Sequence, residues 1–202
     1  MLVYADNAAT TKTSAAAIKS MLYAMEEGFA NPSSLHTPGQ RAKELLEEAR
    51  KSVADSLGVL PAEIYFTSGG SESDNQALLT IAEIGKRKGK MHIISTKFEH
   101  HAVLHTLQKL EKQGFSVTLL DVHENGIVSP EELKAAIRED TAGVSVMYAN
   151  NEIGTVQPIA EIGEICRAAG VLFHTDAVQA IGHVPVSITG AKVDMLSLSA
   201  HK

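Results

Sequence analysis

The sequence has little of several features that mark particular classes of protein. It contains one cysteine, Cys166, so no disulfide can form within the chain. No apolar run approaches the roughly 18 residues that a membrane-spanning helix needs. The amino terminus, from Met1 to Asp6, lacks the basic start and the long apolar stretch of a secretory signal. We therefore expect a cytoplasmic protein without membrane spans.

The sequence also lacks an excess of positive charge. The formal net charge is −6, which gives no basic footprint for nucleic acid. Hydrophobic residues make up 44% of the chain and charged residues 21%, which are ordinary values for a globular protein. A chain of 202 residues can bury a sizeable core, as one domain or as a large domain with an arm.

Strand-like and helix-like patterns alternate along the chain. Helices are predicted near residues 14–27, 38–57, 71–88, 101–113 and 158–169 and from Pro130 onward, and strands near 64–67, 92–95, 117–120, 144–148 and 171–174. A last strand-like apolar run begins near Asp194 and delivers Ser199, His201 and Lys202 to its carboxyl end. This alternation predicts an α/β fold, a three-layer sandwich in which helices cover both faces of a mostly parallel sheet. Residues 1–14 are predicted to form an amino-terminal arm, and residues 15–202 a large domain.

Small residues follow the first predicted strand and open a helix. In an open parallel sheet, ligands bind outside the carboxyl ends of the strands. Gly70 and Ser71 are candidates for a phosphate site, because small residues let the backbone come close and a helix start presents free N–H groups. A plain turn between strand and helix, capped by Ser71, is the alternative.

Histidines and asparagines follow two further predicted strands. The ring of His100 could stack on a flat cofactor. His101 and His105 are four residues apart on a helix and could bind a metal, but no third ligand is apparent nearby, and surface histidines are the ordinary alternative. The amides of Asn150 and Asn151 could donate to a ring oxygen of a ligand, or simply form a turn.

Asp176 and Lys202 follow the last two apolar runs. Pyridoxal phosphate (PLP) needs an amine for a Schiff base and a carboxylate that keeps its pyridine nitrogen protonated, so that the ring accepts electrons. Gln179 could reach the same cofactor, and Ser199 and His201 are further phosphate candidates. An aspartate that caps a helix and a solvated chain end are the alternatives. Together these residues favour a PLP site without a metal.

Seven motifs, in order along the whole chain, resemble the amino-terminal half of cysteine desulfurases of the type that serves nitrogenase and iron–sulfur cluster assembly. This family belongs to the class V aminotransferase group of fold-type I PLP enzymes. The motifs are Tyr4-Ala5-Asp6-Asn7-Ala8-Ala9-Thr10-Thr11, Asn31-Pro32-Ser33-Ser34-Leu35-His36, Thr67-Ser68-Gly69-Gly70-Ser71-Glu72-Ser73-Asp74-Asn75, Glu99-His100, Asn150-Asn151-Glu152-Ile153-Gly154, His174-Thr175-Asp176-Ala177-Val178-Gln179 and Ser199-Ala200-His201-Lys202.

The resemblance implies a homodimeric transferase that converts L-cysteine to L-alanine. The sulfur would pass through a persulfide on an enzyme cysteine to an acceptor protein, such as an iron–sulfur scaffold or a thiolation enzyme. Lys202 would hold PLP and move protons at the α-carbon, His100 would stack on the ring, and Asp176 would pair with the pyridine nitrogen. The remaining implied contacts are Asn151 and Gln179 at the ring oxygen, and Gly70, Ser71, Ser199 and His201 at the phosphate.

The chain departs from this family in length. Members continue well past the lysine, and that part carries the persulfide cysteine, a substrate-binding arginine and a further phosphate contact. We therefore expect residues 15–202 to be a large domain that is incomplete at its carboxyl end and that a complementary carboxyl-terminal chain could complete. Cys166 lies on the wrong element for the persulfide, and its helix-like pattern favours a half-buried thiol over a nucleophile.

Two other functions stay open at this point. A selenocysteine lyase or a related class V aminotransferase is the alternative among enzymes, and the products formed from cysteine would separate these possibilities. A truncated, inactive assembly partner is the alternative outside enzymes, and it would carry no yellow chromophore.

Overall fold

The computed structural model describes residues 1–202, and the chain divides into two compact units. The first unit comprises Met1–Phe66 together with His201, and the second comprises Thr67–Ala200 together with Lys202. The predicted division into an arm of residues 1–14 and a large domain of residues 15–202 stays a prediction. None of the helices combines the length and the apolar character that crossing a membrane requires.

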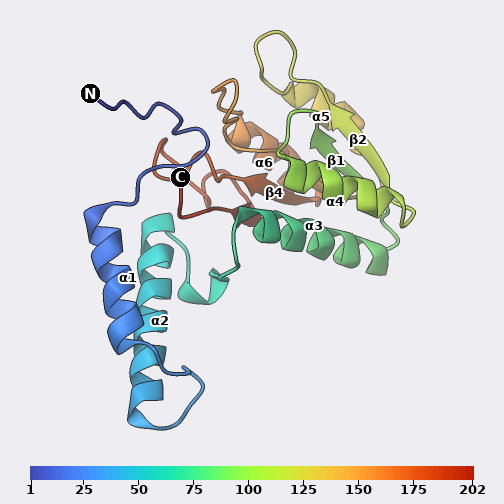
Figure 1. Ribbon diagram of the computed structural model, residues 1–202. Helices are drawn as coiled ribbons and strands as arrows, with labels where there is room; N and C mark the ends of the chain where they lie inside the picture. The colour runs from blue at the N-terminus through green and yellow to red at the C-terminus, as the bar shows by residue number, and fades with distance from the viewer. The chain divides into compact units, whose positions relative to one another are not determined.

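The first unit contains two long helices and a short 3-10 helix. They are α1 (Ala15–Glu27), α2 (Thr37–Leu57) and η1 (Pro61–Glu63), and α1 and α2 lie side by side in Figure 1. The Ser14 hydroxyl caps α1 by accepting from the Ala17 N–H, and Gly58 ends α2 in the left-handed conformation that glycine adopts easily. The Arg41 guanidinium joins the two helices by donating to the Tyr23 hydroxyl over 2.8 Å.

The second unit is built on a five-stranded sheet in which every neighbouring pair is parallel. The strands are β1 (His92–Thr96), β2 (Ser116–Leu120), β3 (Thr141–Ser145), β4 (Leu172–Asp176) and β5 (Met195–Ser197), in the spatial order β2-β1-β3-β4-β5. The predicted parallel sheet is confirmed.

Four helices cover the two faces of this sheet (Figure 1). They are α3 (Gly70–Arg87) and α4 (His101–Glu111) on one face, and α5 (Pro130–Ala136) and α6 (Ile159–Ala169) on the other. Ile93 packs with Leu78 of α3, whereas the next residue, Ile94, packs with Ile162 of α6, because successive strand side chains point to opposite faces. The predicted three-layer α/β architecture is confirmed.

Two strand predictions differ from the structure. Residues 64–67 form no strand, because no neighbouring strand is available to them: the Ile64 N–H donates to Pro61 and its carbonyl accepts from Arg50. The strand predicted at residues 144–148 instead spans Thr141–Ser145. Pairing with β1 stops there because the Met147 N–H donates to the Glu99 carboxyl group, whereas Val146 and Tyr148 still donate to the His174 and Asp176 carbonyls.

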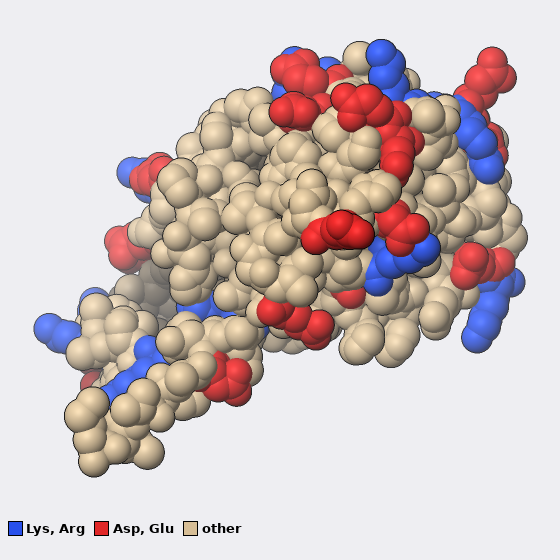
Figure 2. All heavy atoms as spheres, turned by 90° about the horizontal axis from the view of Figure 1, so that it is seen from above, with Lys and Arg blue, Asp and Glu red and all other residues tan.

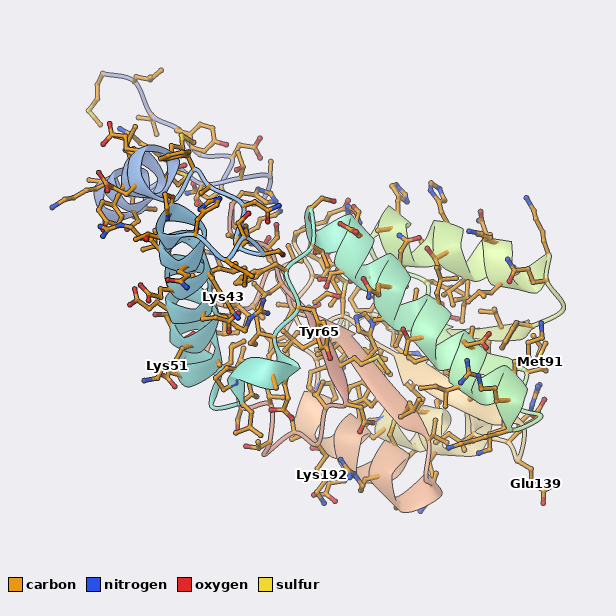
Figure 3. All side chains as sticks on the ribbon, turned by 90° about the horizontal axis from the view of Figure 1, so that it is seen from below. Lys43, Lys51, Tyr65, Met91, Glu139 and Lys192 are labelled. Atoms are coloured by element: carbon orange, nitrogen blue, oxygen red, sulfur yellow. The ribbon has the colours of Figure 1, made fainter.

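The order of the strands creates a crevice between β1 and β3. The chain passes from β1 outward to β2 and then returns to β3 on the other side of β1, which is the arrangement in which open α/β sheets bind ligands. Met91 lies directly before β1, and Glu139 lies two residues before β3; both are labelled in Figure 3. They mark the amino-terminal edge of the sheet. The candidate site lies at the opposite edge.

Candidate active site

Asp176 is the last residue of β4 and lies at the carboxyl edge of the sheet. It is only 4% exposed, and one carboxyl oxygen, Oδ1, accepts from the Val178 N–H over 2.9 Å. Burial raises the pKa of Asp176, while the Val178 hydrogen bond and the charges of His100 and Lys202 act to lower it. The structure therefore brings together the three residues predicted to act on the cofactor ring.

His100 caps the amino end of α4. Its Nδ1 accepts from the Ala102 N–H over 3.1 Å, so a neutral His100 ring carries its proton on Nε2. The side chains of His101 and His105 stack with their ring centres 5.5 Å apart. No group of three or more metal-ligating side chains is arranged around them to hold a metal ion.

The predicted phosphate residues Gly70, Ser71 and Ser199 lie together at the start of α3. No side chain caps this helix, so its first N–H groups have no capping acceptor. A Cβ atom on Gly70 would lie 2.9 Å from Val178 Cγ2 and 3.7 Å from Ser199 Cβ. The absence of a side chain on Gly70 therefore lets Val178 pack directly against the helix start.

The last two residues of the chain belong to different units. His201 lies with the first unit, where its Nδ1 is 3.0 Å from Thr10 Oγ1 and its carbonyl oxygen accepts from the same hydroxyl over 3.0 Å. Its phosphate role stays a prediction. Lys202 lies with the second unit, is half-buried, and exerts its charge on Asp176.

The two adjacent asparagines have different surroundings. Asn150 is 6% exposed and fully engaged, since its Nδ2 donates to the Phe98 carbonyl and its Oδ1 accepts from the N–H groups of Glu152 and Ile153. Asn151 is half-buried and is the one of the pair that the sequence assigns to the cofactor. The structure thus gives Asn150 the turn role and leaves Asn151 as the ligand candidate.

Gln179 follows β4 by three residues and carries a buried amide oxygen, Oε1, without a hydrogen-bond partner. Buried polar atoms are nearly always paired in folded proteins. An orphan oxygen beside Asp176 therefore fits a position where a ligand supplies the missing partner.

A buried polar network behind Asp176 was not anticipated from the sequence. His174 is fully buried, and its ring nitrogens lie 2.9 Å from Ser145 Oγ and 3.0 Å from Ser197 Oγ. Burial lowers the pKa of His174 to about 4, so its ring is neutral. Asp74 of α3 lies beside it, with Oδ1 3.7 Å from His174 Nε2, which is too long for a hydrogen bond.

The sequence did carry a signal for Asp74. It occupies the apolar face of α3, where Ala77, Leu78 and Ile81 follow at helical spacing and are buried. A charged residue on such a face marks either a polar network or a functional site. Glu99 lies in one of the seven motifs but has no role predicted from the sequence, although its carboxyl group joins the ends of β1 and β3.

Cys166 lies on α6 inside the core. It is 1% exposed, and burial raises the pKa of its thiol to about 12. Nucleophilic cysteines need the opposite setting, exposed and electropositive. This environment agrees with the structural role that the sequence favours.

Comparison with known proteins identifies the family. The family model described as "Aminotransferase class-V" matches residues 3–202. The chain belongs to the class V aminotransferase family. Members of this family depend on PLP, and the fold is the fold-type I large domain that the sequence predicts.

The curated relatives include several enzymes named cysteine desulfurase IscS. The chain is 55% identical to the protein of Methanosarcina thermophila over 200 residues, which cover 99% of this chain and 49% of the relative. It is 54% identical to the protein of Clostridium botulinum (strain Kyoto), covering 99% of this chain and 50% of the relative. The chain therefore spans about half the length of the curated relatives it matches.

Solved structures of similar proteins share the whole fold. A "NifS-like protein" superposes with a TM-score of 0.95 at 43% identity, over 100% of this chain and 55% of the other. A structure described as SspA in complex with cysteine gives a TM-score of 0.91 at 39% identity, over 97% of this chain and 56% of the other.

The residues present fit PLP. Asp176 supplies the buried carboxylate that the pyridine nitrogen requires. Lys202 supplies an amine, and its charge acts to lower the pKa of Asp176. The start of α3 at Gly70 has no side-chain cap and presents free N–H groups, which suits the phosphate. The unpartnered oxygen of Gln179 is an acceptor, so it can take a hydrogen bond only from a donor group of a ligand.

Proposed function

We propose that this chain is the PLP-binding part of a cysteine desulfurase. The observation that carries the proposal is the buried carboxylate of Asp176, faced by His100 and Lys202, beside the uncapped start of α3. The relatives named cysteine desulfurase match along 99% of the chain, and the similar SspA structure holds cysteine. Both support L-cysteine as the substrate and L-alanine as the product.

Each predicted site residue has a distinct task in this proposal. When bound, PLP supplies an aldehyde that takes up amines and a protonated ring that accepts electrons. The amine of Lys202 holds the cofactor and then moves a proton at the substrate α-carbon. Asp176 keeps the proton on the pyridine nitrogen, and His100 lays its ring against the cofactor with a proton on Nε2. The other contacts are Asn151 and Gln179 at the ring oxygen, and Gly70, Ser71, Ser199 and His201 at the phosphate.

The sulfur leaves cysteine through exchange with a thiol. The bond between Cβ and sulfur breaks, a thiolate of an enzyme cysteine forms a bond to that sulfur, and Cβ gains a proton to give alanine. The buried thiol of Cys166 is unsuited to this attack. We therefore assign the persulfide to the part of the relatives' length that this chain does not span, and an iron–sulfur scaffold or thiolation enzyme then accepts the sulfur.

We also propose a homodimer, with residues 1–14 as an arm and residues 15–202 as the large domain. The helix α1 buries none of its residues, and three of its apolar side chains are largely exposed. They are Met21, Leu22 and Met25, at 46%, 54% and 70% exposure. Apolar side chains gathered on one helix mark a surface that another chain covers. Sedimentation velocity tests this: a monomer at micromolar concentration would contradict the dimer.

The substitution Lys202→Ala tests the cofactor assignment. Incubation of the chain with PLP, followed by borohydride reduction, should add one reduced PLP to Lys202, seen by mass spectrometry of the intact chain and of its peptides. The variant should lose this adduct and the yellow absorbance band. Lys109→Ala is the matched control, because Lys109 lies on the exposed face of α4. An unchanged band in Lys202→Ala would contradict the proposal.

A further inference from the structure

Three carboxyl groups lie buried together at the carboxyl ends of the strands. Asp74 is 1% exposed, and Glu99 and Asp176 are each 4% exposed. One oxygen of Asp74 and one of Glu99 have no hydrogen-bond partner. A buried carboxylate without donors or a cation is strongly disfavoured, whereas a protonated acid is far less so. The three groups therefore cannot all carry a negative charge at neutral pH.

The titratable groups that face this cluster are His174 from β4, His100 from α4 and Lys202 near the end of the chain. His174 provides no positive charge, because burial lowers its pKa to about 4. The positive charge of Lys202 acts on Asp176, whereas His100 accepts the Ala102 N–H at Nδ1 and so brings no positive charge in this arrangement. Positive charge is thus directed at one of the three carboxyl groups.

Hydrogen bonds alone do not separate the three carboxyl groups, because Glu99 also accepts two of them. Asp176 accepts from the Val178 N–H, which stabilises its ionised form. Burial raises the pKa of Glu99 to about 8. The pKa of Asp74 is raised to about 7, mainly by burial and to a smaller extent by repulsion from Asp176. Burial thus favours the protonated forms of Glu99 and Asp74, whereas the Val178 hydrogen bond and the charge of Lys202 favour the ionised form of Asp176.

We propose that Asp74 and Glu99 are positioning residues: Glu99 stays largely protonated at neutral pH and Asp74 keeps its proton in a large fraction of the molecules, so that Asp176 is the main anion facing the cofactor's pyridine nitrogen. A second negative charge beside Asp176 would make Asp176 hold a proton, and the pyridine nitrogen would lose its partner. This positioning role rests on the proposed PLP function. The protonation states themselves are properties of the chain without cofactor.

Glu99 has a second positioning effect, through its hydrogen bonds. Its Oε1 accepts from Thr96 Oγ1 over 2.6 Å and from the Met147 N–H over 2.9 Å. These bonds join the end of β1 to the segment after β3, across the crevice where the ligand is expected. His100, the cap of α4, directly follows Glu99, so these hydrogen bonds also hold the backbone at the start of α4 in place.

Carbon-13 NMR of the cofactor-free chain, labelled at Asp and Glu carboxyl carbons, measures these protonation states directly. Between pH 5 and pH 9, two carboxyl signals should titrate late, at about 7 for Asp74 and about 8 for Glu99. Asp74→Asn should remove the first late signal and Glu99→Gln the second. If both groups are already ionised at pH 6, the inference is overturned.

The substitution Asp176→Asn tests the coupling between the groups. Removing the Asp176 charge should lower the titration midpoint of Asp74 by on the order of one pH unit. The control Asp121→Asn, an exposed carboxylate paired with Lys97, should leave both midpoints unchanged. A midpoint of Asp74 that stays the same in Asp176→Asn would contradict the inference, and this comparison requires no folded Asp74 variant.

The two proposals fail separately. A chain that shows both late titrations but forms no PLP adduct on Lys202 would contradict the proposed function and leave the charge assignment standing. A chain that forms the adduct while Asp74 and Glu99 are ionised at pH 6 would overturn only the present inference.

Discussion

At the scale of single residues, the site is decided by which polar groups are left without a partner inside the protein. Asn150 uses its amide groups to hold a turn, whereas Gln179 keeps a buried oxygen unpaired. Lys202 directs its charge at Asp176. Residues of the same chemical type therefore divide into structural and ligand-binding groups according to their local contacts.

Cys166 should be almost unreactive in the folded chain. Its pKa of about 12, against an ordinary 9.0, lowers the thiolate fraction about a thousandfold at neutral pH, and burial slows access further. Iodoacetamide labelling followed by mass spectrometry should therefore be slow in buffer and fast in denaturant.

A cysteine moved to the surface of the same helix is the matched control for this experiment. In the variant Cys166→Ala with Ala160→Cys, the thiol lies at an exposed position of α6 and should label rapidly. Fast labelling of Cys166 in the native chain would show that α6 opens readily, and it would remove the argument against a nucleophilic role.

At the scale of elements, the start of α3 and the ends of the parallel strands create the site. The helix begins at Gly70 without a capping side chain, and the segments after β4 and β5 bring Val178 and Ser199 next to it. The dipole and free N–H groups of a helix start favour an anion. On the face shown in Figure 2, acidic and basic side chains are interspersed, so no basic stripe there offers an alternative anion surface.

Gly70→Ala should weaken PLP binding by on the order of tenfold or more, since loss of a charge-assisted hydrogen bond costs about 1.5–3 kcal/mol. The added Cβ would lie 2.9 Å from Val178 Cγ2, which is too close for normal packing. The dissociation constant for PLP, measured by absorbance titration, checks this expectation.

Gly69→Ala is the control for this prediction. Its added Cβ would meet nothing within 4 Å, and the backbone at φ 162° is extended, as any residue allows. Equal losses of affinity in the two variants would indicate that the close packing at Gly70 has no part in binding the phosphate.

At the scale of the whole molecule, buried ionisable groups make stability depend on pH. Glu99 binds its proton more tightly in the folded chain, with a pKa of about 8 against 4.5, so its contribution to stability falls as pH rises through 8. His174 has the opposite sign, because its folded pKa of about 4 lies below 6.5. Its contribution is present above pH 6.5 and is lost as pH falls through about 4.

The free energy of unfolding should therefore fall between pH 6.5 and pH 8, because the loss from Glu99 exceeds the small remaining gain as His174 of the unfolded chain finishes losing its proton above pH 6.5. Glu99 alone accounts for on the order of 1–2 kcal/mol over this range, since one pKa unit corresponds to about 1.4 kcal/mol. Glu99→Gln should flatten the decline, as urea unfolding at several pH values can measure. The exposed Glu83→Gln is the control, and a decline in Glu99→Gln as steep as in the unaltered chain would contradict the argument.

The sequence by itself determined the α/β class, most of the elements and the identity of the candidate cofactor residues. Apolar periodicity and caps are local properties, so α2, predicted at residues 38–57, begins one residue away from its place in the structure. Asp176 and Lys202 could be recognised because both follow apolar runs, and the ends of parallel strands meet at one edge of a sheet.

Only the tertiary structure decided which groups face each other. A strand needs a partner, so residues 64–67 form none, and β3 ends where Glu99 takes the Met147 N–H. Asp74 and Asp176 are far apart in the sequence, and their repulsion exists only because α3 packs against β4 and β5. Burial and pairing depend on contacts between distant segments, which the order of residues does not reveal.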